Sequence, residues 1–227
     1  MFGFRLAMRF LSATVLFAVL LFIPAGTMTW WRAWVIVGVI SVGMLASTLR
    51  MLPSHKDLLI ERLKPLLQKG QPLIDKIIVL LFLWSYLGLF SFVARDVFHW
   101  HLLSRPGTIV SSFGMVLFFA GARIVSFSMR ENRFAAVVVR HQEERQHTVI
   151  DTGVYSVVRH PMYAGMIPML MGIALWLESY AGALFALVPG GLLAVRILFE
   201  ERFLKRELKG YTAYTQRVRY RLIPFFW

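Results

Sequence analysis

Two charged residues near the end of the last long apolar stretch have types and spacing suited to chemistry. Arg196 and Glu200 are separated by three apolar residues, so on a helix their side chains share one face, one turn apart. Ionisable side chains at the edge of a bilayer are costly to keep there and are therefore candidates for a functional site. The same spacing also fits a structural ion pair within one helix, so both interpretations stay open at this point.

A second polar group stands directly before an apolar stretch, in the sequence His160-Pro161-Met162-Tyr163. A proline disfavours helical backbone in the residue before it and suits the first position of a helix. We therefore expect a loop to end at His160 and a helix to begin at Pro161. The free backbone N–H groups in the first turn of that helix can face an anionic group such as a carboxylate.

The elements that must position these residues are membrane-spanning. The chain has 227 residues, of which 58% are hydrophobic and only 16% charged, whereas soluble domains carry about a quarter charged residues. A helix needs about 17–25 apolar residues to cross a bilayer. Six stretches meet or approach this length, at roughly 10–26, 31–52, 76–98, 107–129, 161–178 and 180–199.

The predicted fold class is therefore all-α, a polytopic transmembrane helical bundle of about six spans within a range of five to seven. Residues 1–129 would form the N-terminal transmembrane helices. Residues 130–227 would form a core with a polar loop, the last two spans and a tail. Pro161 and Pro168 predict a kinked or partly embedded fifth span, and Pro189 predicts a similar disturbance of the sixth.

The loop at 53–70 carries the pattern of a short helix lying on the membrane surface. The Ser54 side chain can cap such a helix by accepting from the backbone N–H of Asp57, three residues later. The Asp57 side chain can in turn accept from the backbone N–H of Ser54. Pro65 would bend it, and a plain connector is the alternative interpretation. The apolar face of this helix would consist of Leu59, Leu63, Leu66 and Leu67.

Charge predicts how the chain is oriented. The net charge is +13, and 21 of the 25 Lys and Arg residues fall in the N-terminal arm, the 50–76 and 130–159 loops and the tail from Arg196. Basic residues of polytopic proteins collect on the cytoplasmic side, so we expect both termini and the polar site there. This asymmetry explains the charge without nucleic acid as a partner.

The sequence lacks the motifs that mark several common kinds of active site. The chain has no cysteine, which excludes disulfides, thiolate metal sites and a cysteine nucleophile. Glycine fingerprints for nucleotides and the nucleophile elbow of hydrolases are also missing from the sequence. His99 and His101 fall beside Trp100 in an outward loop and fit interfacial residues better than a metal pair. No metal is expected.

The segment from about 130 to the C-terminus resembles the isoprenylcysteine carboxyl methyltransferase family. The resemblance rests on HTVIDTGVY at 147–155, RHPMYAG at 159–165, and RILFEE at 196–201, followed by two tyrosines in the tail and LIP at 222–224. Order, spacing and membrane context agree across these motifs. The first four spans carry no such signature.

The resemblance implies a membrane methyltransferase with a site for S-adenosyl-L-methionine, roofed by the C-terminal segment, and a lateral path for a lipophilic acceptor. It implies that Glu200 holds the amino group of the cofactor and that Arg196, the catalytic residue, faces the acceptor. The implied cofactor-binding residues are Arg140, His147, Thr148, Val149, Ile150, Tyr155, His160, Pro161, Met162, Tyr163 and Glu200.

The acceptor and even the functional class have alternatives. Within a methyltransferase, an isoprenylcysteine-like carboxylate is favoured because Arg196 suits an anion, with a phospholipid amine or a small thiol as alternatives. A non-enzymatic haem or transport subunit would need paired histidines within spans or broken helices in symmetric halves, and the sequence displays neither. A membrane anchor that recruits partners through its basic aromatic tail is a third interpretation.

Overall fold

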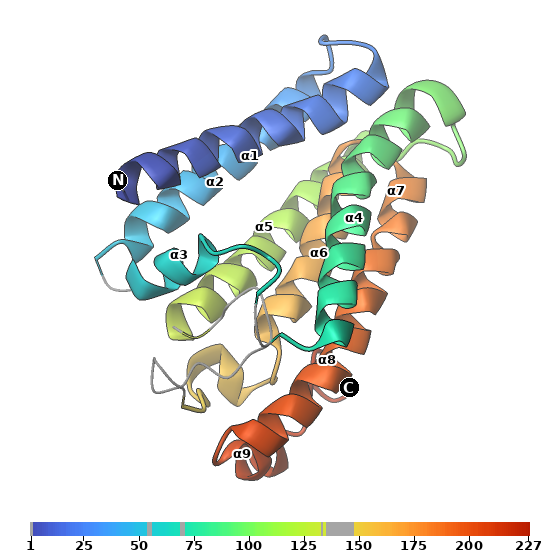
Figure 1. The fold of residues 1–227 in the computed structure, drawn as a ribbon. Coiled ribbons are helices and arrows are strands. Elements are labelled where there is room, and N and C mark those ends of the chain that lie inside the picture. Colours follow the sequence, from blue (N-terminus) through green and yellow to red (C-terminus); the bar gives the residue numbers. More distant parts are fainter. Residues whose placement is uncertain (1, 54–55, 69–70, 133, 135–147) are drawn as a thin grey trace.

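The computed structural model describes residues 2–53, 56–68, 71–132, 134 and 148–227, and every regular element in these ranges is helical. Figure 1 shows their arrangement. The elements are α1 (Phe2–Ala25), α2 (Trp31–Met51), α3 (Lys56–Arg62), α4 (Leu73–Arg95), η1 (Asp96–Trp100), α5 (Thr108–Glu131), η3 (Gly153–Ser156), α6 (Pro161–Trp176), α7 (Tyr180–Phe185), α8 (Leu187–Glu207) and α9 (Tyr211–Arg217).

The predicted all-α bundle is confirmed. Among the residues that the structure describes, five helical segments are long and apolar enough to cross a membrane: α1, α2, α4 with η1, α5, and α7 with α8. The chain is thus an integral, multi-pass membrane protein. The sixth apolar helix, α6, has 16 residues and is shorter than an ordinary span. The first helix begins at Phe2, eight residues before the predicted run, because apolar residues alternate there with Arg5 and Arg9 and maintain the helix.

The prolines act unequally on the last two spans. α6 continues through Pro168 without interruption, so the predicted kink does not divide that helix. The sixth span is divided at Ala186 into α7 and α8, three residues before Pro189. Proline has no N–H to donate to the carbonyl four residues earlier, which here belongs to Phe185 at the end of α7.

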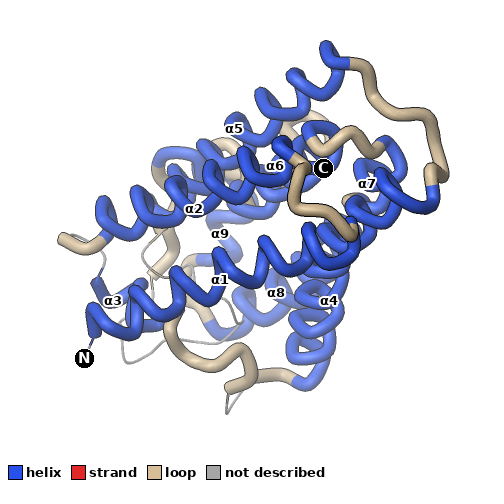
Figure 2. The backbone as a smooth tube through the Cα atoms, turned by 90° about the horizontal axis from the view of Figure 1, so that it is seen from above, coloured by secondary structure: helices blue, strands red, loops and turns tan. Residues whose placement is uncertain are grey.

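The helices pack so that the long connections gather at one end of the bundle. α1 contacts both α2 and α4 and lies between them when the bundle is seen from above (Figure 2). α4 packs on α8, and α5 packs along α6. In Figure 1 η3 and α9 lie at the lower end and α3 lies at the left beneath the end of α2, while the connections 26–30 and 101–107 lie at the upper end. The fold therefore brings the polar segments of the sequence to one side.

Glycines allow α5 and α6 to touch through their backbones. A Cβ on Gly114 would lie 2.8 Å from the carbonyl oxygen of Gly172, and one on Gly165 would lie 2.7 Å from that of Gly121. Each helix thus contributes two glycines seven residues apart, which place them on one face. Small residues at membrane helix contacts permit such close approach, and here they let α6 lie directly against α5.

The predicted surface helix is shorter than expected. α3 ends at Arg62, and the chain then turns before Pro65. Proline disfavours helical backbone in the preceding residue, so Pro65 ends the helix and does not merely bend it, and Leu66 and Leu67 do not extend its apolar face. Leu58 and Leu59 are buried, which attaches α3 to the bundle. Ser54, the predicted cap, lies outside the described residues.

Candidate active site

The C-terminal segment is bonded to the residues that lead into α6. The backbone N–H of Arg159 donates to the carbonyl of Tyr220 over 2.9 Å, and that of His160 donates to Arg221 over 2.9 Å. The carbonyl of Trp227 accepts from the N–H of Arg221 over 2.8 Å. These bonds hold the last residues of the chain as a strap, residues 218–227, over the start of α6.

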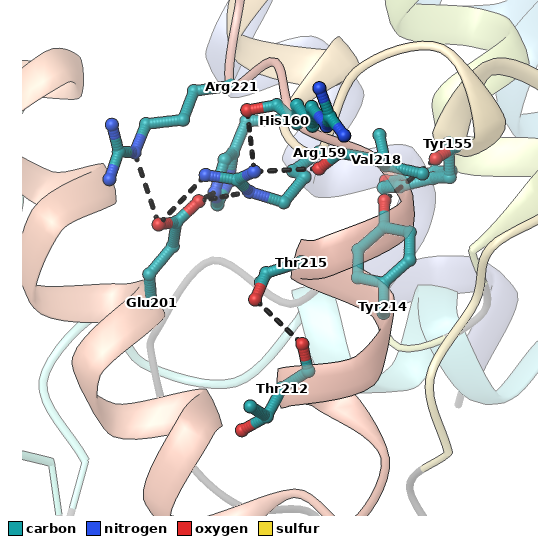
Figure 3. Close-up of polar contacts among 10 residues, drawn as sticks. Tyr155, Arg159, His160, Glu201, Thr212, Tyr214, Thr215, Val218 and Arg221 are labelled. Carbon is teal, nitrogen blue, oxygen red and sulfur yellow. Dashed lines mark hydrogen bonds and ion pairs between the residues drawn. The ribbon is translucent and has the colours of Figure 1, made fainter.

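A buried ion pair joins this strap to α8. The guanidinium of Arg159 donates from Nε to Oε1 of Glu201 over 2.6 Å and from Nη2 to Oε2 over 3.2 Å (Figure 3). Its Nη1 donates to the carbonyls of Val218 and Arg219 over 2.7 and 2.8 Å. Arg159 is 7% exposed and Glu201 3%. One side chain therefore connects the loop before α6, the strap and α8.

Two further side chains meet the same carboxylate. His160 Nε2 lies 3.3 Å from Oε1 of Glu201, and Arg221 donates from Nε to Oε2 over 3.1 Å. Figure 3 shows Arg159, His160 and Arg221 converging on Glu201. The hydrogen-bonding capacity of this buried carboxylate is therefore used by groups of the protein itself. We therefore interpret Glu201 as the centre of the scaffold that supports the strap.

The neighbouring Glu200 has a different environment. Its Oε2 accepts a hydrogen bond of 2.8 Å from the hydroxyl of Tyr163, and the side chain is half-buried. The rings of Tyr163 and His160 are parallel, with centres 5.6 Å apart. The guanidinium carbon of Arg196 lies 5.9 Å from the centre of the Tyr163 ring. The structure thus brings together four of the predicted site residues at the start of α6 and the middle of α8.

Arg196 has a partner that the sequence did not suggest. Its Nε donates to Oδ1 of Asp75, in the first turn of α4, over 3.1 Å. Both side chains are buried. The alternative interpretation, an ion pair within one helix, is therefore incomplete, because Arg196 forms an ion pair that joins α8 to α4.

A pocket of about 220 Å³ lies between α4 and α8. Its wall is mostly apolar, and two acidic residues and two arginines stand among its lining residues. These residues are Pro72, Ile74, Asp75, Phe199, Glu200, Arg202, Phe203 and Arg206. The pocket gives Glu200 an accessible face on the side of the bundle where α4 begins.

The residues before α6 form a short turn that buries Tyr155. The carbonyl of Tyr155 accepts from the hydroxyl of Tyr214 in α9 over 2.8 Å. Burial raises the pKa of the Tyr155 hydroxyl to about 12, and the charges of Glu200 and Arg62 act on it more weakly, so this residue is neutral at physiological pH. The turn begins at Gly153, whose φ of +55° favours glycine.

The other predicted cofactor residues are spread around this turn. Val149 packs against the buried cluster formed by Leu208, Tyr211, Tyr214 and Val218. Thr148 is exposed and Ile150 half-buried. Pro161 occupies the first turn of α6 as predicted, and Met162 Sδ lies 3.6 Å from Nη2 of Arg62 in α3. Arg140 and His147 lie outside the described residues.

Four residues of this region were missed as site residues: Arg159, Glu201, Asp75 and Arg62. The first two stand inside the motifs RHPMYAG and RILFEE, directly beside His160 and Glu200. Their opposite charges at these positions are a signal that could have marked them as residues of the site. Asp75 and Arg62 precede these motifs by many residues and carry no local signal.

Comparisons with known proteins agree with this part of the chain. The family model described as phospholipid methyltransferase matches residues 109–209. Protein-S-isoprenylcysteine O-methyltransferase B of Arabidopsis thaliana is 30% identical over 112 residues, which cover 48% of this chain and 57% of that protein. A probable protein-S-isoprenylcysteine O-methyltransferase of Oryza sativa subsp. indica is 33% identical over 112 residues, covering 48% and 59%.

The chain spans about half the length of the curated relatives that it matches. The family model covers α5 from its second residue, α6, α7, α8 and the polar segment between α5 and α6. All the predicted site residues lie within this range. The resemblance of this chain to the isoprenylcysteine carboxyl methyltransferase family is therefore confirmed by its relatives at about 30% identity over half of the chain.

Proposed function

We propose that this protein transfers a methyl group from S-adenosyl-L-methionine to a lipophilic acceptor in the membrane, and that the acceptor group is an isoprenylcysteine-like carboxylate. The observation that carries the proposal is the grouping of Tyr163, Glu200 and Arg196 beside a pocket with apolar walls. The names of the sequence relatives support the same class of reaction.

The residues present fit the cofactor. S-adenosyl-L-methionine carries an ammonium, a carboxylate and a sulfonium, and it supplies the methyl group. The half-buried carboxylate of Glu200, oriented by Tyr163, complements the ammonium through a charge-assisted bond. The parallel rings of His160 and Tyr163 provide aromatic surface of the kind that attracts cations. Residues 148–150 and Tyr155 would complete the site from the loop side.

The protein's part in this reaction is alignment and exclusion of water, because methyl transfer is an in-line displacement. The strap covers the start of α6 through the bonds to Arg159 and His160 and would keep water from the donor side. Arg196 would hold the acceptor carboxylate so that one of its oxygens points at the methyl group. A planar guanidinium suits this task because it can bind a carboxylate by two bonds.

The charges that line the pocket are balanced, since Asp75 and Glu200 stand among its residues together with Arg202 and Arg206. The preference for an anionic acceptor over a protonated amine therefore rests on Arg196, whose planar guanidinium suits a carboxylate. The apolar walls formed by Ile74 and Phe199 suit the hydrocarbon part of a lipid.

Replacing Glu200 with glutamine tests the cofactor site. The change keeps the size of the side chain and removes its charge, so the contact with the ammonium loses roughly 1.5–3 kcal/mol. We expect the affinity for S-adenosyl-L-methionine to fall about tenfold or more, measured by titration calorimetry in detergent. Glu207→Gln on the exposed end of the same helix is the matched control and should bind normally. Unchanged affinity in the Glu200 variant would remove this residue from the cofactor site.

We also propose that both termini and the site face the cytoplasm, because most of the basic residues lie on that side of the spans. Reporters fused after Lys69 and after Trp227 should both be cytoplasmic, and one after Leu103 should lie on the opposite side. A reporter at Leu103 on the same side as Trp227 would contradict this orientation.

A further inference from the structure

The partner of Arg196 comes from a helix outside the matched region. Asp75 stands in the first turn of α4 and precedes Arg196 by 121 residues, and the family model begins at residue 109. The bond between Arg196 Nε and Asp75 Oδ1 measures 3.1 Å, and the two residues are 7% and 3% exposed. The charge of Arg196 is thus balanced and its side chain oriented from the N-terminal half of the protein.

Asp75 is itself fixed by the segment that leads into α4. Gln71 donates from Nε2 to Oδ2 of Asp75 over 2.7 Å and is 5% exposed. The backbone N–H of Gln68 donates to Oε1 of Gln71 over 3.1 Å, and the N–H of Gln71 donates to the carbonyl of Gln68 over 3.4 Å. Both oxygens of the Asp75 carboxylate therefore have donors on different elements, which limits the orientations that the group can adopt.

Such a support matters because an arginine side chain has many rotamers, and ordering a long side chain carries an entropic cost. A contact at Nε fixes the plane of the guanidinium, and that plane decides where a carboxylate can bind. Asp75 also lines the same pocket as Glu200. The residue that orients Arg196 therefore borders the pocket beside Glu200.

We propose that Asp75 is a positioning residue for methyl transfer, which holds the Arg196 guanidinium in the plane that receives the acceptor carboxylate. This inference rests on the proposed function. Asp75 contacts neither donor nor acceptor in this account and acts through Arg196. It makes α4, which lies outside the residues that the family model matches, part of the proposed catalytic arrangement.

The test uses the full chain in detergent, labelled S-adenosyl-L-methionine and N-acetyl-S-farnesylcysteine as the acceptor probe. Asp75→Ala removes the acceptor of the Nε bond, and we expect kcat to fall about tenfold, with the affinity for S-adenosyl-L-methionine changed by less than about threefold. Asp75→Asn keeps an oxygen that can accept from Nε and should recover most of that loss. Asp57→Ala, an exposed aspartate in α3, is the matched control.

A double-mutant cycle separates positioning from a general structural role. If Asp75 acts through Arg196, then Asp75→Ala should add no further loss of kcat to Arg196→Ala. The inference would be overturned if Asp75→Ala lowered kcat by the same factor in the wild-type and Arg196→Ala backgrounds. It would also be overturned if Asp75→Ala left kcat at the wild-type value. Asp75→Asn serves if the alanine variant fails to fold, and a folded asparagine variant as inactive as Arg196→Ala would also overturn it. A wild-type protein that binds S-adenosyl-L-methionine but leaves the probe unmethylated would instead refute the proposed acceptor.

Discussion

Replacing Arg196 with alanine should lower turnover about a hundredfold while the affinity for S-adenosyl-L-methionine stays within about threefold of the wild type. The reason is that Arg196 lies one turn before Glu200 on α8 and would hold the acceptor, whereas Glu200 would hold the donor. A hundredfold loss corresponds to about 2.7 kcal/mol of transition-state stabilisation. Methylation kinetics and titration calorimetry on the same preparation measure the two quantities.

Lysine at the same position makes this prediction more specific. Arg196→Lys keeps the charge and loses the planar fork that binds a carboxylate by two bonds, so its turnover should stay well below that of the wild type. Near-normal turnover of the lysine variant would argue against carboxylate recognition and favour an amine or thiol acceptor. Lys205→Ala, on an exposed part of α8, controls for the loss of one basic residue. Cofactor affinity and turnover falling together in Arg196→Ala would assign Arg196 a structural role.

Replacing Arg159 with alanine should cost the fold about 3–5 kcal/mol, the range seen when one partner of a buried ion pair is removed. The change leaves Glu201 buried with fewer donors and releases two carbonyls of the strap. Unfolding in detergent should therefore begin at a lower temperature. The strap should also become a site of early proteolytic cleavage, because the bonds that tie it to α6 and α8 are weakened.

An exposed ion pair in the same region offers the control for Arg159. Arg217 pairs with Asp151, and its side chain is 67% exposed. Pairs of this kind contribute about 0–1 kcal/mol, so Arg217→Ala should leave the unfolding temperature almost unchanged. Equal effects of the two substitutions would mean that the Arg159–Glu201 pair contributes no more to stability than a surface contact.

The parts of the fold that follow from local rules could be predicted from the sequence. Span positions depend on the length of apolar runs, and all six predicted stretches correspond to helices. The start of α6 follows from the local preference of Pro161. The end of α3 was wrong by several residues because the leucine pattern continued past Pro65, and the proline decided the boundary.

The contacts between distant segments could not be predicted in this way. Nothing near Asp75 indicates that it meets Arg196, and the charges of Arg159 and Glu201 beside the site motifs suggest a role without giving their geometry, since such pairs depend on how the helices pack. The packing of α5 on α6 did leave a trace in the sequence, because glycines at 114 and 121 and at 165 and 172 recur at the same interval in two successive apolar stretches. This shared interval is a signal for a close helix contact.

The shortness of α6 has a consequence for the depth at which the candidate site lies in the membrane. Its 16 residues rise roughly 24 Å at about 1.5 Å per residue, against a hydrocarbon core about 30 Å thick. None of the residues of α6 is exposed, so the longer neighbouring spans, and not lipid, surround this short helix. With Trp176 at one interface, where tryptophan is favoured, His160 would lie at the depth of the acyl chains of the other leaflet. Under the proposed function, a lipid acceptor would then meet the site while its chain is still in the membrane, without prior extraction.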